Sequence, residues 1–110
     1  MKKLLLSIAF LLPAMGMMAQ TQVKTAEGIL EGKDLSGITV FKGVPFAAPP
    51  VGNLRWKAPQ PVQKWQGVRE AKEFGPNPMQ EPIFGDMNFG TKANSEDCLY
   101  LNIWTPAKTM

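Results

Sequence analysis

The stretch EDCLYLNIWTP, residues 96–106, decides the fold class of this chain. Its central residues alternate between two faces of an extended strand, with Leu99, Leu101 and Ile103 on one face and Tyr100, Asn102 and Trp104 on the other. Both faces are largely apolar, so the strand requires cover on two sides, as in the interior of an α/β sheet. No other part of the chain has a helical pattern that would provide this cover. The sequence therefore predicts the α/β class, represented here mostly by antiparallel β-strands and Pro-rich irregular structure.

Three short runs upstream of this strand also have the composition of β-structure. They cover residues 22–25, 28–33 and 37–44, and turn residues stand between them at 26–28 and 34–37. These connections are too short to carry a crossover helix. We expect the three runs to form an antiparallel meander.

The composition changes between Pro45 and Pro82, where eight of the ten prolines occur. Proline fixes φ and lacks a backbone donor, so regular structure should be scarce here. The segment still carries large aromatic side chains, which disordered linkers seldom have. We predict an ordered extended wrap, followed by a flexible loop at 77–94 with Phe84 and Phe89 as its anchors. The tryptophans are expected to pack in the core rather than to form a stacking platform; they are Trp56, Trp65 and Trp104.

The first 19 residues have the pattern of a secretory signal peptide. Two lysines precede the apolar run Leu4–Leu12, and a small-residue and Met-rich segment follows Pro13. A membrane-spanning helix would need about 20 apolar residues, and this run is shorter. We predict cleavage after Ala19, with cleavage after Gly16 as the open alternative, and a secreted or periplasmic product that comprises residues 20–110.

The charge of the chain excludes some classes of partner. The sequence has 12 basic and 9 acidic side chains; without Lys2 and Lys3 the balance becomes 10 against 9, a net charge of +1. A nearly neutral exported chain has no electrostatic footprint for nucleic acid or for an anionic membrane. The oxygen ligands Asp34, Glu81, Asp86 and Asn88 lack the spacing of a calcium loop, so neither a metal nor a cofactor is predicted.

Three segments together resemble the type B carboxylesterase and cholinesterase family, esterases of the α/β-hydrolase fold. They are FKGVPFAAPPVGNLRWKAPQP at 41–61, WQGVREAKEFGP at 65–76 and EDCLYLNIWTP at 96–106. The resemblance implies that the chain corresponds to the N-terminal portion of a much longer family protein. It also implies a carboxylic ester as the small-molecule substrate of the complete protein.

Ester hydrolysis by this fold needs a serine at a strained turn, a histidine base, an acid and an oxyanion site. The sequence contains no histidine and no Gly-x-Ser-x-Gly motif. Cys98 follows Glu96 and Asp97, whose charge disfavours a thiolate nucleophile. Those two carboxylates lie on opposite faces of an extended chain and cannot easily share one substrate. We therefore expect no catalytic residue and no cofactor-binding residue in this chain.

The resemblance does assign structural roles to a few residues. It implies a salt bridge between Arg55 and Glu96 that pins the Pro-rich wrap to the strand. The family commonly pairs the cysteine at Cys98 with an upstream cysteine, and Met79 occupies that position here. The resemblance therefore implies that Cys98 is a free, buried thiol.

These observations lead to a main interpretation and two alternatives. The main one is the N-terminal part of a secreted carboxylic ester hydrolase that is catalytically incomplete in this chain. The first alternative is a non-catalytic secreted binding or adhesion module built from the same fold. The second is complementation by a separately encoded C-terminal remainder. An apolar terminal strand without cover would favour aggregation of a free-standing module.

Overall fold

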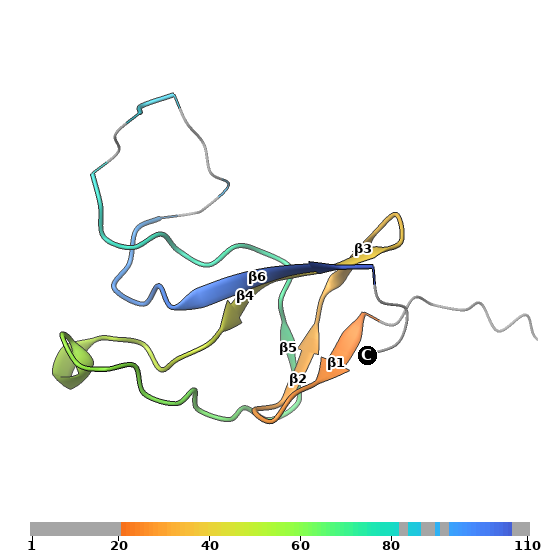
Figure 1. Ribbon diagram of the computed structural model, residues 1–110, viewed down its shortest axis with the longest axis horizontal. Coiled ribbons are helices and arrows are strands. Elements are labelled where there is room, and N and C mark those ends of the chain that lie inside the picture. The colour runs from red at the N-terminus through yellow and green to blue at the C-terminus, as the bar shows by residue number, and fades with distance from the viewer. Residues whose placement is uncertain (1–20, 82–83, 87–89, 91–92, 107–110) are drawn as a thin grey trace, which may run out of the picture.

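The computed structural model describes residues 21–81, 84–86, 90 and 93–106 (Figure 1). The predicted signal peptide and the side chains of Asn88 and Phe89 lie outside the described residues. Within the described part, no helix is long and apolar enough to cross a membrane.

The regular elements of the described residues are two three-stranded sheets and a short 3₁₀ turn η1, Gly52–Leu54. The first sheet has the strand order β1-β2-β5, with β1 at Gln22–Lys24, β2 at Ile29–Glu31 and β5 at Val68–Glu70. The second has the order β3-β4-β6, with β3 at Lys33–Leu35, β4 at Ile38–Pro45 and β6 at Tyr100–Thr105. These strands form four pairings, of which three are antiparallel and one is parallel. The predicted predominance of β-structure is confirmed.

The predicted continuous meander is wrong, because the chain changes sheet at Gly32. β1 and β2 form one antiparallel pair and β3 and β4 another, but β2 and β3 belong to different sheets. At Gly32 a Cβ atom would lie 2.5 Å from the carbonyl oxygen of Val40 and 2.9 Å from the ring of Phe41. The absence of a side chain therefore lets the chain pass close beneath β4 as it leaves the first sheet.

β5 is the strand that the sequence analysis missed. It pairs in parallel with β2, with Leu30 opposite Arg69, although residues 32–67 separate the two strands in sequence. Lys72 reinforces this pairing, since its Nζ lies 2.5 Å from Glu31 Oε2. The hydrogen bond from Lys72 lowers the pKa of Glu31, and the same bond raises the pKa of Lys72.

The second sheet contains a tight hairpin and a bulge. Ser36 and Gly37 join β3 to β4 with φ angles of 53° and 87°, the left-handed conformation that a two-residue hairpin turn requires. Between Phe41 and Val44 the pairing with β6 is interrupted by a bulge. At this bulge the N–H of Gly43 donates to Asn102 Oδ1 at 3.0 Å, which replaces the missing ladder bond.

The small core lies where the two sheets meet. Leu30 from β2, Phe41 from β4 and Ala71 are almost fully buried. Partly buried apolar side chains complete the cluster; they are Val23, Val44 and Trp65. Trp65 also anchors its loop, because its Nε1 donates to the carbonyl of Ile29 at 3.0 Å.

Only one of the three tryptophans follows the prediction of core packing. Trp65 packs against the core, whereas Trp56 is 97% exposed and Trp104 is 53% exposed. Trp56 has a φ of 60°, an uncommon conformation for a residue other than glycine. Phe84 is also mostly exposed and does not anchor the 77–94 loop; instead, a parallel bridge between Asn77 and Asn94 closes it.

A pair of glycine substitutions tests the bulge. Gly43 and Gly37 both have positive φ, so Ala at either position costs about 1 kcal/mol in backbone conformation. Only at Gly43 would the new Cβ also approach a backbone oxygen, that of Glu73 at 2.6 Å, while Gly37 has open space. We expect Gly43→Ala to lower the unfolding free energy by about 1–3 kcal/mol more than Gly37→Ala in urea titration. Equal losses would show that the bulge tolerates a side chain.

Candidate functional site

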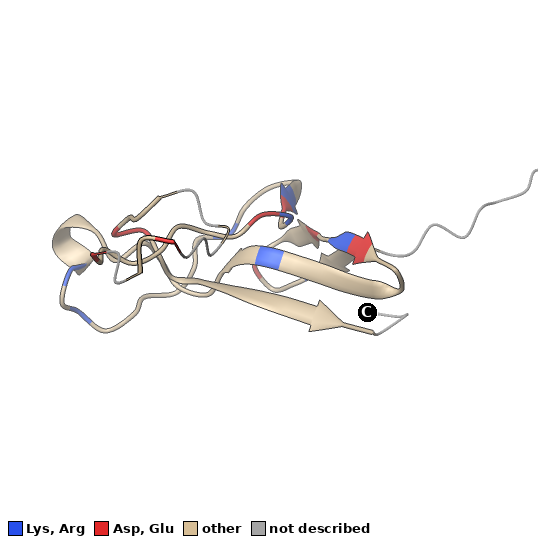
Figure 2. Cartoon of the chain, turned by 90° about the horizontal axis from the view of Figure 1, so that it is seen from above, with Lys and Arg blue, Asp and Glu red and all other residues tan. Residues whose placement is uncertain are grey.

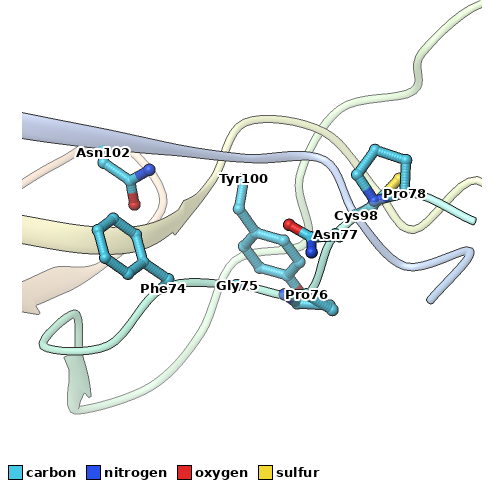
Figure 3. A pocket seen from close by; sticks show the side chains of 8 residues that line it. All are labelled: Phe74, Gly75, Pro76, Asn77, Pro78, Cys98, Tyr100 and Asn102. Atoms are coloured by element: carbon cyan, nitrogen blue, oxygen red, sulfur yellow. The ribbon is translucent and has the colours of Figure 1, made fainter. Parts of the chain in front are cut away.

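A shallow pocket of about 290 Å³ lies between the segment Phe74–Pro78 and the start of β6. Figure 3 shows Tyr100 and Asn102 projecting from β6 toward that segment, with Cys98 near Pro78. The lining residues are Phe74, Gly75, Pro76, Asn77, Pro78, Cys98, Tyr100 and Asn102. This pocket brings residues of the Pro-rich wrap beside the strand that the sequence analysis singled out.

Close packing of aromatic side chains determines the shape of this pocket. The ring of Tyr100 lies directly against Gly75, where a Cβ would stand 2.8 Å from ring atoms. Phe74 contacts Trp104 at a centroid distance of 6.4 Å, and Lys42 Nζ lies 4.2 Å above the Phe74 ring. The aromatic pair and the cation–π contact attach the wrap to one face of the second sheet.

Tyr100 is the most perturbed ionisable group of the pocket. Burial raises the pKa of Tyr100, a hydrogen bond to Asp97 raises it further, and Arg69 opposes these effects. The phenol therefore stays protonated at neutral pH, so it can donate a hydrogen bond but does not act as a base or nucleophile.

The pocket has polar groups but no catalytic pair among the described residues. Cys98 is free, and it is half-buried rather than buried as the resemblance implied. Asn102 already accepts a bond from Gly43. With no histidine in the sequence, neither thiol nor phenol has an imidazole partner to activate it. The arrangement holds the wrap against the strand.

The two residues of the salt bridge implied by the resemblance lie in contact. Arg55 Nη2 is 2.9 Å from Glu96 Oε1, and the side chains are 54% and 43% exposed. An ion pair with this exposure contributes less than about 1 kcal/mol because water and salt screen it. The contribution of the Arg55–Glu96 pair to stability stays a prediction.

The other charged groups of the described residues are distributed along the chain. Figure 2 shows Lys and Arg interspersed with Asp and Glu along the ribbon. In the described ranges, no group of three or more His, Cys, Asp or Glu side chains could hold a metal ion. The Lys72–Glu31 pair has the shortest ion-pair distance among the described residues, and it could not be predicted because β5 was not predicted.

Comparison with known proteins identifies the family. The model of the Carboxylesterase family matches residues 19–110. The chain belongs to the carboxylesterase family. Among similar carboxylesterase-family proteins, phenmedipham hydrolase of Pseudarthrobacter oxydans is 47% identical over 88 residues, which are 74% of this chain and 17% of that protein. Fumonisin B1 esterase of Sphingopyxis macrogoltabida is 44% identical and matches 74% of this chain and 15% of that protein.

Solved carboxylesterase structures share the fold of this segment. The crystal structure of the Geobacillus stearothermophilus carboxylesterase EST55 at pH 6.2 superposes with a TM-score of 0.70 at 46% identity. The match covers 80% of this chain and 17% of that one. The chain thus spans less than a fifth of the length of these relatives, and the matched region is an N-terminal segment of an α/β-hydrolase carboxylesterase.

Tyr100 can be titrated alone because it is the single tyrosine of the sequence. We expect its ultraviolet phenolate absorbance to appear above the ordinary pKa of 10. Because the pKa is raised in the folded state, the stability that Tyr100 contributes is complete below pH 10 and is lost as pH rises through the folded pKa. Asp97→Asn should move the midpoint downward. A midpoint at 10 in both proteins would contradict the described environment of the phenol.

Glu96→Gln tests the ion pair with Arg55. We expect a loss of unfolding free energy below about 1 kcal/mol at low salt, and a smaller loss at high salt. Glu81→Gln, at an exposed position of the loop, is the matched control and should change stability by only a few tenths of a kcal/mol. Equal melting temperatures for the two variants would show that the pair does not stabilise the wrap.

Proposed function

We propose that this chain supplies the N-terminal segment of an exported carboxylic ester hydrolase and contributes scaffold rather than catalytic groups. The family assignment over residues 19–110 supports the hydrolase class. The absence of histidine from all 110 residues supports a purely structural contribution, because acyl transfer to serine requires a general base. In the complete protein, the nucleophile, base, acid and oxyanion site come from elsewhere in the domain.

The contribution of the segment is to present β6 in a fixed position. Three contacts attach different parts of the segment to this strand or to the residues just before it. They are the bulge at Gly43, the pocket around Tyr100 and the Arg55–Glu96 pair. A scaffold strand held from several sides can position the elements that pair with it.

Export is the second part of the proposal, and it rests on residues 1–19. The two lysines, the apolar run and the small residue Ala19 follow the order of a cleavable leader. The near-neutral mature charge agrees with a small-molecule ester rather than nucleic acid or an anionic membrane as the partner. The names of the relatives mention phenmedipham and fumonisin B1; for this chain we propose only the carboxylic ester class.

The alternative of a free-standing adhesion or binding module has less support. A self-sufficient module would bury the apolar faces of its longest strands. Here Leu101, Ile103 and Trp104 of β6 are 37%, 43% and 53% exposed. That exposure favours a segment that is completed by further structure.

A chimera tests the proposed function. Residues 21–106 of this chain would replace the matched segment of the Geobacillus carboxylesterase EST55. We expect the chimera to hydrolyse a para-nitrophenyl ester within about tenfold of the host rate, because no catalytic group is exchanged. The host without any segment is the control and should be inactive. A soluble, folded chimera without esterase activity would contradict the proposal.

A further inference from the structure

A set of hydrogen bonds, which we call the neck, joins residues 77–80 to residues 93–95. The N–H of Asn77 donates to the carbonyl of Ala93 at 3.0 Å, and the N–H of Ser95 donates to the carbonyl of Asn77 at 2.8 Å. The sequence has a single cysteine, so no disulfide within the chain can tie these two segments together. The neck therefore depends on noncovalent contacts.

Proline limits the backbone hydrogen bonds that the first of these segments can make. Pro76 and Pro78 flank Asn77 and have no N–H, so Asn77 is the backbone donor at this point of the neck. A further contact across the neck comes from a side chain, since Asn94 Nδ2 donates to the carbonyl of Gln80 at 2.7 Å. Asn94 thus holds the chain beyond Pro78, where the bonds of Asn77 do not reach.

The neck borders the pocket described above. Pro78 lines the pocket and lies next to Cys98 (Figure 3). The inner end of this wall is fixed by close packing, because Gly75 lies directly against the ring of Tyr100. The outer end, residues 78–80, is exposed. The position of this outer end therefore depends on the neck.

The segment on the other side of the neck, which leads into β6, has anchors of its own. Glu96 pairs with Arg55 at 2.9 Å, and the N–H of Asp97 donates to Ser95 Oγ at 3.1 Å. These contacts do not depend on the bonds of the neck, so this segment keeps its place when a neck bond is lost. The side that can shift is the pocket wall at residues 78–80.

We propose that Asn94 is a latch whose side-chain hydrogen bond holds residues 78–80 against the pocket, and that loss of this bond opens the pocket wall next to Cys98. Both partners of the bond, Asn94 and Gln80, are exposed, so water competes for them and the latch opens transiently. The pocket volume of about 290 Å³ then belongs to the latched state. The inference does not depend on the proposed function, because it concerns contacts within this segment.

The single thiol of the chain reports on this opening. The full chain would be reacted with iodoacetamide, a small neutral reagent, and the rate of alkylation of Cys98 followed by mass spectrometry. We expect Asn94→Ala to raise this rate about three- to tenfold, because the loss of one hydrogen bond shifts the opening equilibrium by that factor. Asn53→Ala, at an exposed asparagine of η1, is the matched control and should leave the rate within about twofold of the parent chain.

Hydrogen exchange of backbone amides gives a second measurement, made on the neck itself. The N–H groups of Asn77 and Ser95 bond across the neck, whereas the N–H of Ala71 bonds to the carbonyl of Glu31 beside the core. In Asn94→Ala we expect exchange at Asn77 and Ser95 to become at least about twofold faster and exchange at Ala71 to stay unchanged. This pattern separates local opening of the neck from a loss of overall stability.

Each outcome of these two measurements decides for or against the latch. Faster alkylation in Asn94→Ala together with faster exchange confined to the neck amides supports it. An unchanged alkylation rate, an equal increase in Asn53→Ala, or unchanged exchange at the neck amides overturns it. Faster exchange at Ala71 also overturns it, because the thiol would then react through general unfolding, and so does a lack of exchange protection at Asn77 in the parent chain.

Discussion

The burial of Phe41 against Leu30 and Ala71 is the contact on which the rest of the structure depends, because it joins two sheets that share no strand. Burying a phenylalanine side chain contributes about 1.5–3 kcal/mol, and few other fully buried apolar groups are present among the described residues. Gly32 makes the contact geometrically feasible, since a side chain there would collide with the Phe41 ring. The N–H of Lys42 in β4 also donates to the carbonyl of Ala71 at 2.8 Å, so a backbone hydrogen bond joins the two sheets beside this core contact.

The bulge at Gly43 connects this core to the pocket. Before the bulge, β4 buries Val40 and Phe41, which are neighbours on opposite faces of the strand. After it, the changed register places Val44 opposite Leu101 and Pro45 opposite Tyr100. Asn102 thus completes the backbone hydrogen bonding at the bulge, while Tyr100 and Trp104 hold the wrap against the same strand. The segment is organised around β6 even though most residues of β6 are exposed.

Sequence reasoning recovered the features that depend on local pattern and on motif resemblance. The alternation of residue types predicted strands near residues 22–24, 38–45 and 100–105, and the three quoted segments predicted the family. The partition into two sheets and the β2–β5 pair could not be predicted in this way, because both depend on contacts between residues far apart in sequence. Trp56 was predicted to be buried because large aromatic residues usually are, but the structure around it provides no neighbouring surface on which to pack.

The parallel pairing of β2 with β5 has a consequence for the order of folding. The β1–β2 pair forms from neighbouring residues, but its sheet is complete only when Val68–Glu70 has been synthesised and the loop of residues 32–67 has closed. Closing a loop of this length is entropically costly before its contacts form, which places the step late. Until Phe41 and Ala71 have been synthesised, Leu30 therefore lacks the side chains that cover it in the folded segment.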